Sequence, residues 1–235
     1  MKTKMWCVVI RASDKGIIRG PFEMKRSDTD SFATFVAHDL SLRRAQQRIW
    51  TNASWKVEGY TAVVGANGSG KSSTLAMLAG QLAPDAGALT MNVDGETISD
   101  TSWSRRVALA APWCTPPQHL TLEQALQFHG TFRTSRTGQL GWGMLLDASG
   151  LKVGDNVPMN RWSSGQRQRL NLALAMGTVA DVVLLDEPAS NLDAQGMAWL
   201  HRVLEDIRRT TTVVVATNDP QREAPKALSL LEIEK

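Results

Sequence analysis

The sequence predicts an α/β fold, and two observations support that prediction. Three short runs rich in β-branched and other apolar residues are typical of buried strands, at Thr61–Gly65, Val182–Pro188 and Thr211–Thr217. The first run leads through a glycine-rich turn into a helical pattern over Ser72–Gly80. The chain has 235 residues, a length that suits one large α/β domain with an inserted subdomain.

Composition narrows the class of protein. An apolar fraction of 43% and a charged fraction of 21% are those of a soluble globular protein. No apolar run is long enough to span a membrane, and no secretory signal is evident. The net charge of +3 is too small to argue for nucleic acid, so no nucleic-acid partner is expected. Cys7 and Cys114 form neither a disulfide framework nor a metal-binding spacing.

An antiparallel β part is predicted ahead of the glycine-rich turn. Residues 32–42 alternate apolar and polar side chains as a strand does, and Arg48–Val57 reads as the partner strand. Residues 82–95 read as a turn and a hairpin with Asp94-Gly95 at its tip. Residues 1–32 are expected to form a loosely ordered extension, unless translation begins at Met24 or their seven basic residues make an arm for a membrane surface.

A helical stretch is predicted between residues 121 and 165. Thr121 followed by Gln124 indicates a capping box at the start of a helix over Thr121–Phe132. His129 lies on the apolar face of that helix and is expected to pack there, not to act in catalysis. A second helix is expected over residues 139–151, and a buried strand over residues 105–112 precedes the stretch.

The segment GANGSGKS carries the first functional signal. It has the form G-x-x-x-x-G-K-S, in which backbone N–H groups surround phosphate oxygens, Lys71 reaches the β- and γ-phosphates and Ser72 offers a hydroxyl to Mg²⁺. The preceding strand and following helix are the context that this motif requires. The residues expected to contact the nucleotide are Gly65, Ala66, Asn67, Gly68, Ser69, Gly70, Lys71, Ser72 and Ser73.

Two adjacent carboxylates carry the second signal. The apolar run from Val182 ends in Asp186 and Glu187. This pairing suits a metal-binding aspartate beside a glutamate that activates water, so Asp186 and Ser72 are the expected Mg²⁺ ligands and Glu187 the expected catalytic base. ATP and Mg²⁺ are therefore the expected cofactors.

Two further segments make the pattern that of a known family. The order of phosphate loop, WSSGQ (Trp162–Gln166), VVLLDEP and SNLD (Ser190–Asp193) resembles the nucleotide-binding domain of ABC ATPases over residues 33–233. The resemblance implies a P-loop NTPase core with a mostly parallel sheet flanked by helices, an N-terminal antiparallel β part and an inserted helical subdomain at about residues 115–165. It also implies that a signature and a D-loop contact the nucleotide, through Ser163, Ser164, Gly165, Gln166 and Asp193.

The chain departs from the family pattern at three places. Arg43, Arg44 and Ala45 stand where the family has an aromatic residue against adenine, so Arg44 is the candidate for stacking and Trp50 is expected to pack. Pro112–Thr115 occupy the place of a glutamine that touches Mg²⁺, and Gln118 lies too far along to replace it.

The third departure is Asn218, which stands where the family typically has a histidine that contacts the γ-phosphate. We count Asn218 with Glu187 as a catalytic residue, although an amide cannot exchange a proton near neutral pH.

Two functions are consistent with this pattern. The resemblance implies an ATP-binding and ATP-hydrolysing subunit that powers a separate transmembrane subunit by dimerising on ATP, with a second copy or a related ATPase domain as partner. Such a subunit is cytoplasmic and peripheral on the inner face of the cell membrane. The alternative is a nucleotide-gated regulatory module with weak ATPase activity, favoured somewhat by Asn218 and by the missing glutamine.

Overall fold

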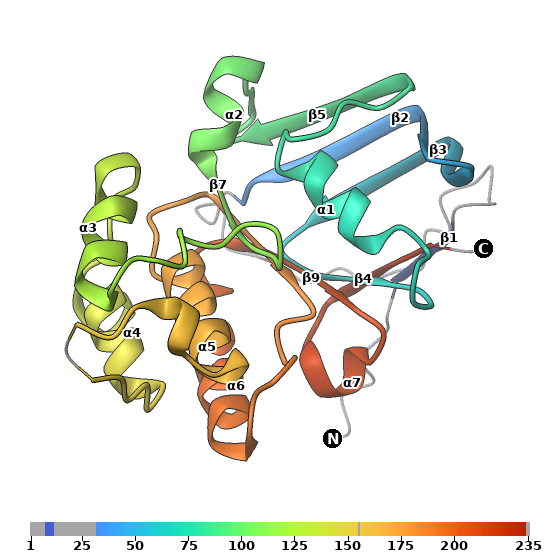
Figure 1. Cartoon of the computed structure of the whole chain (residues 1–235). Helices are drawn as coiled ribbons and strands as arrows, with labels where there is room; N and C mark the ends of the chain where they lie inside the picture. The colour runs from blue at the N-terminus through green and yellow to red at the C-terminus, as the bar shows by residue number, and fades with distance from the viewer. Residues whose placement is uncertain (1–7, 12–31, 155, 234–235) are drawn as a thin grey trace, which may run out of the picture.

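The structure, a computed structural model, describes residues 8–11, 32–154 and 156–233 (Figure 1). A six-stranded sheet with the order β1-β10-β4-β9-β8-β7 forms its centre, and every neighbouring pair is parallel. The predicted α/β fold with a mostly parallel sheet is confirmed. The strands are β1 (Val8–Arg11), β10 (Ser229–Glu232), β4 (Tyr60–Val64), β9 (Thr212–Thr217), β8 (Val182–Asp186) and β7 (Val107–Ala110).

A four-stranded antiparallel sheet lies above the parallel one in Figure 1. Its strand order is β3-β2-β5-β6, and the predicted pairing of its first two strands is confirmed. Asp94 and Gly95 join its last two strands with φ of 54° and 81°, as the predicted hairpin turn requires. The strands are β2 (Thr34–Arg44), β3 (Gln47–Glu58), β5 (Ala86–Val93) and β6 (Glu96–Thr97).

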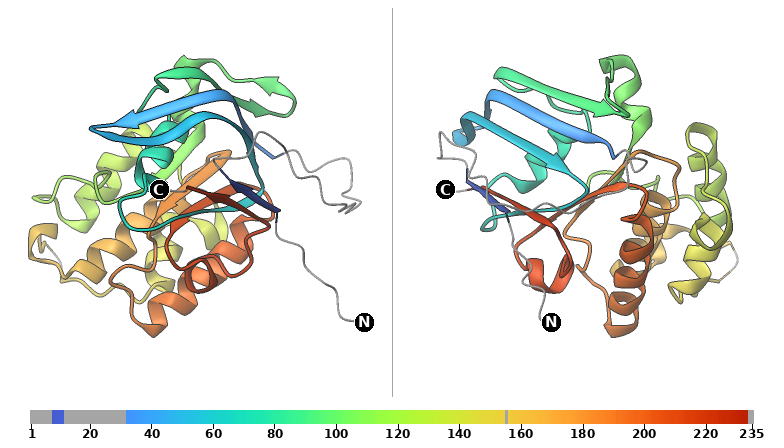
Figure 2. Two further views of the ribbon diagram at one scale, coloured as in Figure 1. Left: turned by 90° about the vertical axis from the view of Figure 1, so that its right-hand side faces the viewer. Right: turned by 180° about the vertical axis from the view of Figure 1, so that it is seen from behind.

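Helices cover both faces of the parallel sheet. Helix α1 lies between the two sheets, and α5 and α6 pack on the opposite face (Figures 1 and 2). The helices are α1 (Lys71–Leu78), α2 (Asp100–Arg106), α3 (Leu122–Phe132), α4 (Trp142–Ala148), α5 (Ser164–Met176), α6 (Ala194–Ile207) and α7 (Pro220–Glu223), with 3-10 turns at Gly138–Leu140 and Met159–Arg161. None of them is long and apolar enough, in the part of the chain described, to cross a bilayer.

This arrangement explains why the strands read as continuous apolar runs. In β9, Val213 and Val215 face the core that α5 and α6 share, whereas Val214 and Ala216 face the core around α1. A parallel strand covered on both faces has no solvent side and so no polar alternation.

Helices α3 and α4 lie at the edge of the molecule, away from the antiparallel sheet (Figure 2). The capping box predicted at Thr121 and Gln124 is confirmed. His129 packs as predicted, with its ring 4.9 Å from that of Trp142 and its Nε2 3.2 Å from the Thr178 hydroxyl. Burial, with the nearby charge of Arg133, lowers its pKa to about 4.

The structure corrects two sequence-based predictions. Arg105 and Arg106 form the last turn of α2, so the strand predicted from residue 105 begins at Val107; both arginines suit a helix C-terminus, where cations are favoured. Within the stretch predicted to be loosely ordered, Val8–Arg11 form an edge strand that pairs with β10. Most of the remainder of residues 1–32 lies outside the described residues.

Candidate functional site

The predicted site residues gather at the carboxyl edge of the parallel sheet. Strands β4, β9 and β8 are neighbours, with Val64 paired to Thr217 and Asp186 paired to Ala216. Because all three run in one direction, the loops that leave them emerge side by side. The glycine-rich loop, Glu187 and Asn218 therefore come together although Glu187 and Asn218 both lie more than 100 residues after the loop in the sequence.

The glycine-rich loop is closed around its own lysine. Lys71 is only 5% exposed, and its Nζ donates to the carbonyl oxygens of Gly65 at 2.8 Å and Ala66 at 3.1 Å. Gly70 adopts φ 110°, and a Cβ there would lie 2.6 Å from the Ile49 side chain. Glycine is thus required for the loop to lie close to β3, and the ammonium stands inside the ring of backbone that would receive phosphate.

The second feature at the carboxyl edge of the sheet is a hydrogen-bonded pair, Ser72 and Asp186. The Ser72 hydroxyl donates to Asp186 Oδ2 at 2.7 Å, while Asp186 Oδ1 is buried with no partner among the described groups. Burial raises the pKa of this carboxyl, against the hydrogen bond from Ser72. A hydroxyl and a carboxylate with an unused oxygen are ligands that Mg²⁺ prefers, so the residues present fit the expected cation.

Glu187 follows directly, in a strained backbone conformation. Its φ is 44°, in the left-handed region that a non-glycine residue rarely adopts. Its N–H donates to Ala216 O at 2.9 Å, and its own carbonyl accepts from Ser190 N at 3.0 Å. Such strain persists only where the surroundings hold it, and it turns this side chain toward the pocket.

Asn218 lies beside the glycine-rich loop. It is exposed, and its Nδ2 donates to Asn67 Oδ1 at 3.2 Å. Asn218 stands where the family pattern has a residue that contacts the γ-phosphate. This position is therefore hydrogen-bonded to Asn67 of the phosphate loop.

The signature begins α5. The Ser163 hydroxyl oxygen caps this helix by accepting a hydrogen bond from Gln166 N at 3.1 Å. In return, Gln166 Oε1 accepts a hydrogen bond from Ser163 N at 2.8 Å. A Cβ on Gly165 would lie 2.7 Å from Asn191 O, so only glycine lets the signature approach the D-loop this closely. Ser164 is exposed at the helix N-terminus, where the dipole favours anions.

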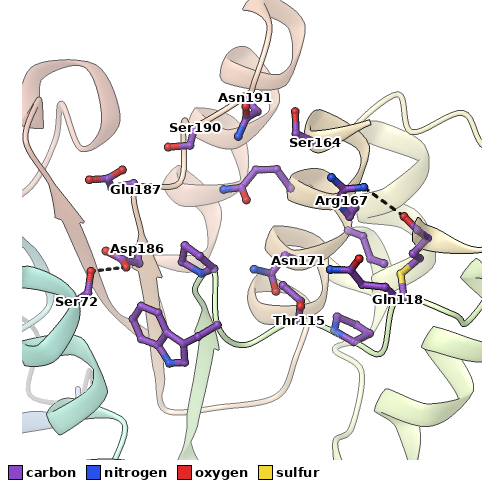
Figure 3. A pocket seen from close by; sticks show the side chains of 16 residues that line it. Ser72, Thr115, Gln118, Ser164, Arg167, Asn171, Asp186, Glu187, Ser190 and Asn191 are labelled. Carbon is purple, nitrogen blue, oxygen red and sulfur yellow. Dashed lines mark hydrogen bonds between the residues drawn. The ribbon is translucent and has the colours of Figure 1, made fainter. Parts of the chain in front are cut away.

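A pocket of about 570 Å³ lies between these features (Figure 3). Ser72 and Asp186 lie at one side of it, Arg167 and Gln118 lie at the other, and Ser164 and Asn191 lie along its rim. Gln118 thus lines the pocket but lies across it from the Ser72–Asp186 pair, in agreement with its place in the sequence.

Comparisons with known proteins agree with this geometry. The family model described as ABC transporter matches residues 51–190. The chain belongs to the ABC transporter ATPase family. It is 32% identical over 197 residues to a cytochrome c biogenesis ATP-binding export protein of Zymomonas mobilis, covering 83% of this chain and 82% of the relative. An aliphatic sulfonates import ATP-binding protein of Albidiferax ferrireducens is 32% identical over 203 residues, which are 85% of this chain and 70% of that protein.

A solved structure supports the fold. The ATP-binding subunit of an ABC transporter superposes with a TM-score of 0.69 at 22% identity, covering 85% of each chain. As an ABC ATPase the chain binds and hydrolyses ATP, and nothing in the comparisons favours the alternative of a regulatory module.

One residue that is predicted to contact the nucleotide, Asp193, has other partners in the described part of the chain. Asp193 caps α6 by accepting from Gly196 N at 2.7 Å, and Arg169 donates to both its carboxylate oxygens at 2.7 and 2.8 Å. The hydrogen bond from Gly196, with Arg169, lowers the pKa of this carboxyl. A contact of Asp193 with nucleotide stays a prediction.

Arg44 ends β2 and is exposed, paired in register with Gln47. Ile49, two residues after Gln47, packs against Gly70, so the hairpin that bears Arg44 lies near the phosphate loop. Trp50 is buried at 1% exposure, and its Nε1 donates to Thr74 Oγ1 at 3.0 Å, which confirms the packing interpretation.

Sequence reasoning missed three residues around this site. Gln168 Nε2 donates to Pro188 O at 3.1 Å, and Asn171 Nδ2 donates to Ala111 O at 3.2 Å. Asn171 is a polar residue within an otherwise apolar helical run, a signal that could have pointed to a specific contact. Glu223, a buried carboxylate at the end of α7, had no signal in the sequence.

Proposed function

We propose that this ABC ATPase powers a separate transmembrane subunit by dimerising on ATP and Mg²⁺. The observation that carries the proposal is the exposed signature at the start of α5. Its cap is already formed, but no hydrogen bond in the described residues joins it to the phosphate loop of the same chain. A prepared anion-binding helix end without an anion in its own chain suits the phosphates held by a second copy or a related ATPase domain.

Each half of the site has a distinct task in this proposal. The loop Gly65–Ser73 and Lys71 hold the phosphates, and Ser72 with Asp186 holds Mg²⁺, which neutralises charge that develops on the phosphate oxygens. Glu187 accepts a proton from the attacking water, and Asn218 orients that water or the γ-phosphate through its amide.

The remaining predicted contacts are those that the signature and Arg44 make with the nucleotide. Ser163, Ser164, Gly165 and Gln166 of one chain face the ATP of the other, with Asp193 at the boundary between them. Arg44 stacks on the adenine, since a guanidinium can lie flat against an aromatic ring.

An apolar groove supports a partner outside the ATPase dimer. It has a volume of about 440 Å³ and lies between α3 and the loop that follows β7. Trp113, Phe128 and Phe132 line it and are 47%, 45% and 70% exposed. Large exposed apolar side chains clustered at one hollow are typical of protein interfaces. We infer that the transmembrane subunit docks here and that the ATPase lies on the cytoplasmic face of the cell membrane.

The substitution Glu187→Gln tests the dimer. It keeps the shape of the side chain and removes the base, so ATP–Mg²⁺ should bind, closure should follow and reopening should stall. We expect light scattering to give a stable dimer for this variant, and phosphate release to fall by about 100-fold or more.

The matched control is Glu58→Gln, at the exposed end of β3, which should behave as the wild type. A Glu187→Gln protein that stays monomeric in ATP–Mg²⁺ while the wild type dimerises would contradict the proposal.

A further inference from the structure

One face of α5 lies against the loop that follows β8. Gly165, Gln168 and Arg169 are at positions i, i+3 and i+4 of this helix and so share that face. A Cβ on Gly165 would lie 2.7 Å from Asn191 O, and Arg169 donates to both carboxylate oxygens of Asp193. These two contacts hold the far end of the loop, while Gln168 faces its near end.

Gln168 holds the loop where it leaves β8. Its Nε2 donates to Pro188 O at 3.1 Å. A proline has no N–H, so the carbonyl oxygen is the one polar backbone group of Pro188, and a side chain of α5 satisfies it. The loop is therefore attached to the signature helix at the residue directly after Glu187.

The backbone at this point needs such support. Glu187 has φ 44°, in the left-handed region that a non-glycine residue rarely adopts. A residue that precedes proline favours extended conformations, so Pro188 opposes this geometry as well. Within the loop, Ser190 N closes the turn by donating to Glu187 O at 3.0 Å. Strain of this kind persists only where surrounding contacts hold it, and Gln168 supplies one of those contacts from a separate helix.

We propose that Gln168 is a positioning residue for ATP hydrolysis, which fixes the direction of the Glu187 side chain through the carbonyl of Pro188. Gln168 and Glu187 line the same pocket, and Figure 3 shows Ser190 and Asn191 of the loop between Glu187 and the start of α5. The amide of Gln168 donates to the backbone of the turn, so it acts through the turn and not on the reacting atoms. The inference rests on the proposed role of Glu187 as the base.

Three substitutions at Gln168 separate the hydrogen bond from the bulk of the side chain. Gln168→Met keeps the length and removes the donor, so kcat for ATP should fall by about ten-fold or more while KM changes by less than about two-fold. Gln168→Glu keeps the shape but turns an acceptor toward the Pro188 carbonyl oxygen, so its kcat should fall at least as far. Gln168→Lys offers a donor again and should recover most of the turnover lost in the methionine variant.

Gln127→Met is the matched control. Gln127 is an exposed glutamine of α3, and its Nε2 donates to Glu123 Oε1 of the same helix at 3.4 Å. The same exchange of atoms at this position removes a hydrogen bond that does not reach the loop after β8. Both kcat and KM should therefore equal those of the wild type.

Glu187→Gln shows which idea fails. If Glu187→Gln turns over normally, the proposed site fails, and the Gln168 inference fails with it. If Glu187→Gln is slow, the double variant with Gln168→Met measures the coupling between the two residues. A residue that acts through Glu187 should cost little more once the base is gone, so a further loss of about ten-fold in the double variant overturns the inference.

The single variants decide the rest when Glu187→Gln is slow. Wild-type kcat in Gln168→Met overturns the inference. A rise in KM with kcat unchanged also overturns it, because Gln168 would then bind the nucleotide. So does a loss of kcat that Gln168→Lys does not recover. If the methionine variant does not fold, Gln168→Glu takes its place under the same three criteria.

Discussion

The phosphate loop and the signature differ in how far a single chain encloses their functional groups. At the phosphate loop, Lys71 is buried and donates to two backbone carbonyl oxygens, and Ser72 already contacts Asp186. At the signature, Ser163 and Gln166 satisfy the start of α5, while Ser164 stays exposed. The first region is enclosed by its own chain, whereas the second is ordered but open. We infer that the phosphate loop can bind ATP alone and that the signature acts only on a second chain.

The largest expected effect is at the closed region. Lys71→Ala removes the cation from the phosphate cradle, so affinity for ATP–Mg²⁺ should fall by about 100-fold or more in calorimetry. Lys56→Ala, at an exposed lysine paired with Glu58 on β3, is the control and should bind as the wild type does. Retained affinity in Lys71→Ala would break the comparison, because the closed region would then not be the primary phosphate site.

The next effect is at the open region. Ser164→Arg places a bulky cation at the exposed end of α5, so ATP should bind with nearly unchanged affinity while turnover falls about ten-fold or more through loss of the dimer. Thr101→Arg, at an exposed position on α2, is the control. A loss of ATP affinity equal to that of Lys71→Ala would show that the signature serves its own chain.

Asn218→His should raise the ATPase rate. An imidazole can hydrogen-bond both the phosphate and the attacking water, and it titrates near neutral pH. One better-placed charge-assisted hydrogen bond is worth roughly 1–2 kcal/mol, or about ten-fold in rate. Steady-state phosphate release at saturating ATP measures this effect.

Asn218→Ala is the companion variant, because it also loses the contact with Asn67 without gaining an imidazole. An unchanged rate in Asn218→His would mean that this chain orients its water through another group.

The smallest effect concerns the stability of the packing around His129 on α3. His129 packs between Trp142 and Thr178, and its pKa is lowered to about 4. A lowered pKa means that the folded state prefers the neutral ring, so this stability is fully present above the unfolded pKa of about 6.5 and declines as the pH falls toward 4. With a discount for partial exposure, unfolding in urea should cost about 1–2 kcal/mol less at pH 4 than at pH 7 on account of this group.

His129→Gln cannot titrate there and supplies the reference. The difference in unfolding free energy between wild type and variant should shrink as the pH falls from 7 to 4. A difference that stays constant would mean that the ring is not held in its neutral form by packing.

Local sequence determined the parts that depend on neighbours along the chain. The phosphate loop needs its glycines, Lys71 and Ser72 in one continuous stretch, so spacing alone identified it. The capping boxes at Thr121 and Ser163 likewise join residues three positions apart, and the first of them was predicted. The strands β4, β8 and β9 were evident because burial on both faces leaves a continuous apolar run.

Tertiary structure alone decided the contacts between segments that are distant in sequence. The start of β7 was misplaced because Arg105 and Arg106 have no local pattern that separates a helix end from a strand. No spacing rule relates Gln168 to Pro188 or Asn218 to Asn67. These pairs meet because parallel strands deliver their loops to one edge of the sheet, and the order β4-β9-β8 is a property of the folded chain.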